Sequence, residues 1–125
     1  MTVEVGDINN KTDQDILDSF RWVCDAIITK TNSMCYLHYS FTTMSVYLLF
    51  STAVCKEEKD ILEDISKGLD SWIKDRALDE YIETNLFVKK YTDNTYGTNI
   101  KFGIKENLSG DKIQKFKAIY KLCFV

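Results

Sequence analysis

The only histidine, His38, and the cysteine three residues before it, Cys35, are the side chains whose types and spacing could carry out chemistry. A thiolate that a histidine activates is a nucleophile, and the same two residues could supply half of a metal site. Residues 34–39 favour a short β-strand, however, and residues three apart in a strand point to opposite faces. We therefore expect no catalytic residue and no metal ligand at this pair.

The other reactive side chains form no recognisable site. The carboxylates of residues 57–64 lie among lysines, which is typical of the solvated outer face of a helix. No glycine-rich loop joins a strand to a helix, so no phosphate-binding motif is present. Trp22 and Trp72 are expected in the core. We predict that the chain is not an enzyme and has no cofactor. The cysteines are expected to be free thiols, and they are Cys24, Cys35, Cys55 and Cys123.

The chain has 125 residues, of which 45% are hydrophobic and 28% are charged. Such a composition provides enough apolar area for folding, and the length is typical of one domain. We therefore expect a single domain over residues 1–125. Residues 1–84 hold 8 basic and 16 acidic side chains, whereas residues 85–125 hold 8 and 3. The lysines of the second part are dispersed, so we interpret them as a solvated surface and expect no nucleic-acid partner.

The first ten residues lack both a basic start and an apolar run. We therefore expect no secretory signal and a cytoplasmic protein. The longest apolar stretch, residues 44–54, is about half as long as a membrane span requires. It predicts a buried helix and no membrane partner.

Helical periodicity dominates the chain before residue 84. The first helix begins at Asp13 after a capping residue, Thr12, and residues 31–33 end it. A second amphipathic helix covers residues 57–67 and ends at Gly68, and Asp70 then begins a further helix. The expected inner face of the first helix is Ile16, Leu17, Phe20, Val23, Cys24, Ile27 and Ile28, and that of the last is Trp72, Ile73, Ala77 and Tyr81.

After residue 84 the apolar residues change to the alternation of a strand. Residues 85–91 and 100–104 predict the two strands of a β-hairpin, with a turn in residues 92–97. Residues 107–111 break the chain, and a closing helix follows. Its expected inner face is Ile113, Phe116, Ile119, Tyr120 and Cys123.

The order of these elements resembles the amino-terminal part of a serpin. Residues 20–32 resemble the first serpin helix and its exit, and Tyr39-Ser40 stands where the family has an aromatic residue and a serine. The other matching segments are Met44-Ser45 with Leu48 in the buried helix, residues 57–62, and Leu86-Phe-Val88 with Lys89-Lys90. The departures are Phe41 in place of a proline, Val54 and Cys55 in place of a glycine-containing turn, and Glu57 in place of a threonine. The short interval between Leu62 and Leu86 is similar to that of trimmed, virus-encoded serpins.

The resemblance covers roughly residues 16–90 and implies an incomplete serpin-like domain. The implied fold class is α+β, with serpin-like helices followed by a β-hairpin or partial sheet and a final helix. Serpins inhibit a protease with a reactive-centre loop that inserts into a large sheet, and this chain ends before such a loop. The implied function is that of a truncated, non-inhibitory member of this protease-inhibitor family. A viral host-defence modulator that binds a protein in the host cytoplasm, with no small-molecule ligand, would fit this description.

Two other functions remain open. A small helical interaction module, such as the Bcl-2-like immune modulators of large DNA viruses, would bind a partner helix in a groove. The amphipathic helices of residues 13–82 favour it, and the β-alternation of residues 85–104 opposes it. A small enzyme with a Cys35–His38 pair is the third alternative.

Overall fold

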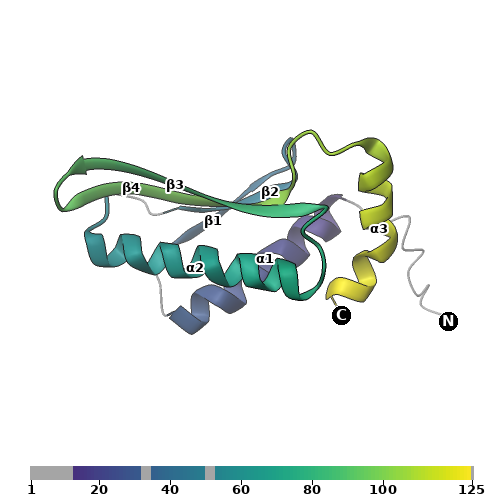
Figure 1. Cartoon of the computed structure of the whole chain (residues 1–125), viewed down its shortest axis with the longest axis horizontal. Helices are drawn as coiled ribbons and strands as arrows, with labels where there is room; N and C mark the ends of the chain where they lie inside the picture. Colours follow the sequence, from purple (N-terminus) through teal and green to yellow (C-terminus); the bar gives the residue numbers. More distant parts are fainter. Residues whose placement is uncertain (1–12, 32–34, 50–52, 125) are drawn as a thin grey trace.

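The chain is a mixed α+β protein, and in the residues that the structure describes three helices accompany one four-stranded sheet (Figure 1). The structure is a computed structural model and describes residues 13–31, 35–49 and 53–124. The elements in chain order are α1 (Asp13–Thr31), β1 (Tyr36–Ser40), β2 (Ser45–Leu49), α2 (Lys56–Asp75), β3 (Ile82–Thr92), β4 (Thr95–Ile104) and α3 (Gly110–Phe124). The predicted α+β class is therefore confirmed.

The sheet is built from two β-hairpins that lie side by side. Its strand order is β1-β2-β4-β3, and every neighbouring pair is antiparallel. Helices α1 and α2 cover one face of the sheet, and α3 stands at the end where β4 leaves it (Figure 1). None of the described helices lies over the opposite face.

The hydrophobic core lies between the sheet and the helices. Phe102 of β4 is at its centre, because its ring meets Phe20 of α1 edge-on at 5.2 Å and Trp72 of α2 at 6.1 Å between ring centroids. Helix α3 joins this core through Phe116, which lies 6.2 Å from Phe20 and 6.0 Å from Tyr81. Aromatic residues therefore connect all three helices to the sheet.

The first helix follows its predicted apolar face. Ile16, Leu17, Phe20, Val23 and Cys24 are buried, and Ile27 and Ile28 pack against the core. The helix ends at Thr31, as predicted, whereas the expected cap Thr12 lies outside the described residues. The expectation that Trp22 is a core residue is wrong, because its side chain is 64% exposed. Trp22 follows Phe20 by two positions, about 200° around the helix, and so faces away from the core.

The predicted buried helix of residues 44–54 is not present in the part that the structure describes. Residues 41–44 form the turn of the first hairpin, and residues 45–49 form strand β2. A short apolar run cannot be assigned to a strand or a helix from its pattern alone. Here β2 pairs with β1 and β4, and Val46 and Leu48 are buried under the helices, whereas Tyr47 and Leu49 are only partly buried on the opposite face. Residues 50–52 lie outside the described segments.

Helix α2 continues through the predicted break at Gly68. Its buried side chains, Leu62, Ile65, Leu69 and Ile73, follow one stripe without interruption. A Cβ atom at Gly68 would stand 3.4 Å from the Ile27 side chain of α1, which is an ordinary van der Waals distance, so α2 passes this position in contact with α1. Burial of this stripe outweighs the low helix propensity of one glycine. The separate helix predicted from Asp70 is therefore the second half of α2.

Ala77 ends α2 in a conformation that favours glycine. Its φ is 56°, and the Ala77 and Leu78 amides donate to the carbonyl oxygens of Lys74 and Ile73 at 3.0 Å each. These two bonds define a Schellman motif, whose left-handed residue is usually glycine. An L-residue with a Cβ atom costs about 1 kcal/mol in this region. The prediction that Ala77 lies on the inner face of a helix is wrong, because its side chain is exposed.

We expect Ala77→Gly to raise the free energy of unfolding by about 1 kcal/mol, because glycine removes the steric cost of the left-handed conformation. Urea denaturation followed by far-UV circular dichroism measures the change. Ala26→Gly is the matched control, since Ala26 is exposed in the interior of α1 and the same substitution there should cost about 1 kcal/mol. Destabilisation by both substitutions would contradict the prediction.

The second hairpin and the closing helix lie in the predicted part of the chain, but the predicted turn of residues 92–97 is too long, because residues 95–99 already belong to β4 and residues 82–84 to β3. β3 and β4 pair along their length with a turn at residues 93–94, and Phe116 is buried on α3. The side chains of Tyr120 and Cys123 are outside the described set.

A four-stranded sheet excludes the all-helical architecture of the Bcl-2-like alternative. Within the described segments, no helix has the length and apolar character that crossing a membrane requires.

Candidate interaction surface

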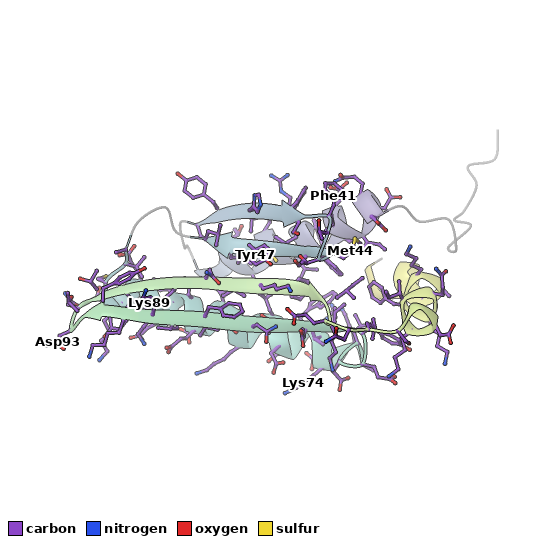
Figure 2. The ribbon with its side chains drawn as sticks, turned by 90° about the horizontal axis from the view of Figure 1, so that it is seen from above. Phe41, Met44, Tyr47, Lys74, Lys89 and Asp93 are labelled. Carbon is purple, nitrogen blue, oxygen red and sulfur yellow. The ribbon has the colours of Figure 1, made fainter. Side chains whose placement is uncertain are left out.

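The face of the sheet without a described helix over it is the candidate functional surface, and Figure 2 looks down on it. Because side chains alternate along a strand, the residues paired across the four strands form rows on this face. The first row is Tyr36, Leu49, Asn99 and Phe87; the second is His38, Tyr47, Lys101 and Asn85; the third is Ser40, Ser45, Gly103 and Glu83. The rows become more polar toward the end of the sheet where α3 stands.

The first row, here called the aromatic row, holds two of the large exposed aromatic side chains of this face. Tyr36 of β1 is 63% exposed and Phe87 of β3 is 52% exposed, although both belong to strands. Leu49 lies between them and is half-buried. Asn99 of β4 separates Leu49 from Phe87, so the row has an aromatic side chain on each outer strand and a polar side chain between Leu49 and Phe87.

An open hollow of about 750 Å³ adjoins the aromatic row at the long hairpin. Phe87, Leu49 and Asn99 line it, together with Tyr91 and Lys89. The Tyr91 ring lies over Gly97, where a Cβ atom would stand 2.7 Å from its hydroxyl oxygen, and the Lys89 ammonium lies 5.6 Å from the centre of the same ring. Gly97 thus leaves room for the Tyr91 ring, because a side chain at position 97 would collide with it. Figure 2 shows Lys89 on this part of the face.

The second row is less accessible. His38 is exposed and its ring lies 6.4 Å from that of Tyr47. Lys101, in the centre of the sheet, is only 6% exposed, and its ammonium donates to Glu106 at 3.2 Å. The ion pair satisfies this buried cation. Lys101 is therefore a structural residue of the face and offers little charge to a ligand.

The Cys35–His38 pair is not brought together. Cys35 packs against the core, whereas His38 is exposed on the opposite face of the sheet. Burial, with a smaller effect of Asp25, raises the pKa of Cys35 to about 11, and burial raises that of Cys24 still further. A thiol with a raised pKa is a poor nucleophile, because little of it is ionised near neutral pH. The arrangement therefore gives no support to the Cys–His enzyme alternative.

We expect Cys35 to react with iodoacetamide at pH 8 at least about tenfold more slowly than glutathione, because only a small fraction of its thiol is ionised at that pH. A raised pKa means that the thiolate fraction, and with it the rate, continues to increase up to about pH 11. Mass spectrometry of alkylated peptides measures the rate at each cysteine. Alkylation of Cys35 in the folded protein as fast as glutathione at pH 8 would contradict this prediction.

Among the described residues, no group of three or more His, Cys, Asp or Glu side chains lies close enough together to hold a metal ion. Some acidic side chains of α2 pair with lysines of the same helix. Lys59 bridges to Glu63 at 2.8 Å and Lys74 to Asp70 at 2.9 Å. The interpretation of these carboxylates as an outer helix face agrees with these contacts.

The aromatic row was missed from the sequence, although a weak signal for it exists. Every second residue of β3 points to the same face, and on the uncovered face these residues are Glu83, Asn85, Phe87 and Lys89. Phe87 is therefore an apolar residue among polar ones. Comparison of the chain with protein-family models, with curated proteins and with solved structures finds no match.

Proposed function

We propose that this chain is a non-enzymatic protein-binding module that holds its partner against the uncovered face of the sheet. The observation that carries the proposal is the aromatic row with the hollow beside it. Tyr36, Phe87 and Tyr91 are each more than half exposed. Aromatic side chains in such positions are the usual anchors of protein interfaces, because they bury a large area at low entropic cost.

The charge of this face favours a protein partner over a nucleic acid. Aromatic side chains on an open sheet can also stack bases, but binding of a nucleic acid requires several cations for the phosphates. Among the described strand residues of this face, the lysines are Lys89 and Lys101, and Lys101 is buried and paired with Glu106. One accessible lysine is too few to follow a phosphate backbone.

Descent from the amino-terminal part of a serpin, without inhibitory activity, is part of the proposal. Its support is the sequence of residues 20–32, Tyr39-Ser40, residues 57–62 and Leu86–Val88. Met44, Ser45 and Leu48 no longer add to that support, because they lie in a turn and a strand and not in a buried helix. Incubation with serine and cysteine proteases tests the absence of inhibition, and a protease complex that survives denaturing electrophoresis would overturn it.

The binding surface is tested with paired surface variants. Tyr36→Ser/Tyr91→Ser removes two exposed aromatic side chains of the uncovered face, and Trp22→Ser removes one of equal exposure from α1. The measurement is chemical crosslinking of each purified chain to partner proteins. We expect the proteins that crosslink to the wild-type chain and to Trp22→Ser not to crosslink to the double variant. Equal recovery with all three chains, or no specific protein with any of them, would refute the proposal.

A further inference from the structure

The long strand β3 is a free edge of the sheet. It has 11 residues, and β4 is its only neighbour within the described sheet. Beyond Ile82, whose amide donates to the Leu78 carbonyl oxygen, the other backbone edge of β3 therefore presents amide and carbonyl groups without a partner among the described residues, and these form a template for another strand. The chain contains no proline that would block such pairing.

The charges on β3 complement a second copy of the same strand. Glu83 and Lys89 both lie on the uncovered face, and neither has an ion pair among the described residues, although Lys89 lies near the Tyr91 ring. In an antiparallel pair of β3 strands centred on Leu86, Glu83 of each copy stands directly opposite Lys89 of the other. Two identical ion pairs then flank the centre, as a two-fold interface requires.

This register is singled out by its contacts. It places Leu86 opposite Leu86, Thr84 opposite Val88 and Asn85 opposite Phe87, with the uncovered faces of both sheets on the same side. A shift of the centre by one residue in either direction places Glu83 opposite Tyr91 or Phe87 and loses both direct ion pairs. Lysines on an edge strand normally prevent pairing, but here the partner strand supplies the matching carboxylate.

We propose that the chain forms a two-fold dimer by antiparallel pairing of the β3 edges, centred on Leu86, to give one eight-stranded sheet. Dimer formation is a separate property from the proposed binding of another protein and does not depend on it. Exposed Phe87 and Val88 add apolar contact at the new junction, since they are 52% and 46% exposed in the single chain. The uncovered faces of the two copies would then form one continuous surface.

Charge reversal tests both the dimer and its register. Analytical ultracentrifugation of the purified chain should show a monomer–dimer equilibrium. Glu83→Lys and Lys89→Glu should each weaken self-association by about tenfold or more, because two attractive pairs become two repulsive ones. When the two variants are mixed, the side chain at position 83 of each chain again faces an opposite charge at position 89 of the other. A heterodimer of at least wild-type affinity should therefore form. Lys67→Glu on α2 makes the same charge change on an exposed helix position and should leave the association unchanged.

Three outcomes would overturn the inference. These are a wild-type chain that stays monomeric at millimolar concentration, single variants that dimerise as tightly as the wild type, or variants that fail to associate when mixed. Circular dichroism of each variant establishes that it is folded. Tyr36→Ser/Tyr91→Ser leaves residues 82–90 intact and should still dimerise, so failure of the proposed function and failure of the dimer are distinguishable.

Discussion

Replacing Phe102 by alanine is expected to lower the free energy of unfolding by about 3–5 kcal/mol. The Phe102 side chain is fully buried in β4 and meets Phe20 edge-on at 5.2 Å and Trp72 at 6.1 Å. Truncation removes the transfer free energy of the ring and leaves a cavity between the sheet, α1 and α2. Because a domain of this size is stable by only about 5–15 kcal/mol, the variant should lose a large part of its stability.

Urea denaturation followed by far-UV circular dichroism measures this loss, and Phe41→Ala is its control. Phe41 lies in the turn of the first hairpin and is 54% exposed, so its truncation should change the free energy of unfolding by less than about 0.5 kcal/mol. Phe102→Leu keeps most of the apolar volume and should fall between the two. Equal effects of Phe102→Ala and Phe41→Ala would mean that Phe102 is not the centre of the core.

The elements that the sequence predicted correctly are those whose apolar residues follow one period over a long distance. Helix α1 buries one stripe from Ile16 to Cys24, and β4 buries Ile100, Phe102 and Ile104 on alternate positions. Each pattern fits one kind of element only, because a helix repeats every 3.6 residues and a strand every two. Local pattern therefore sufficed for α1, for the second hairpin and for the inner face of α3 at Phe116.

The errors arose where tertiary contacts decide the local structure. The run Val46–Leu49 is apolar on both faces of the sheet, with Val46 and Leu48 in the core and Tyr47 and Leu49 on the uncovered face, and nothing local distinguishes such a short strand from a buried helix. Gly68 is a helix-ending residue by propensity, yet it lies inside α2 because the buried stripe of the helix continues on both sides of it, at Ile65 and Leu69. Both positions depend on residues distant in the chain.

The candidate surface was less predictable than the fold. Tyr36 and Phe87 are 51 residues apart and become members of one row only through the order β1-β2-β4-β3, which no motif in the sequence indicates. The Cys35–His38 pair, in contrast, could be rejected from strand alternation alone, and the two side chains do lie on opposite sides of the sheet. A surface assembled across strands requires the topology, whereas a local pair requires only the geometry of one strand.

Replacing Gly103 by alanine is expected to destabilise the chain by about 3 kcal/mol or more. Gly103 lies in β4 under the turn that joins β1 to β2. A Cβ atom there would collide with the Met44 carbonyl oxygen and would stand 2.5 Å from Ser45 Cβ and 2.6 Å from Ser45 Cα. The Met44 oxygen also accepts the Ile104 amide at 3.1 Å, and Met44 is held at a φ of 49°, so this turn cannot move away without losing that bond.

Gly110→Ala is the matched control for this prediction. Nothing lies within 4 Å of a Cβ atom at Gly110, the first residue of α3, so alanine there should be neutral or stabilising by up to about 1 kcal/mol. Thermal and urea denaturation of both variants measure the difference. Replacing glycine by alanine also lowers the conformational entropy of the unfolded chain, which stabilises the folded state at both positions. At Gly103 this stabilisation is too small to offset a collision between two backbone segments. Stabilities that agree within error would show that the β1–β2 turn does not rest on Gly103.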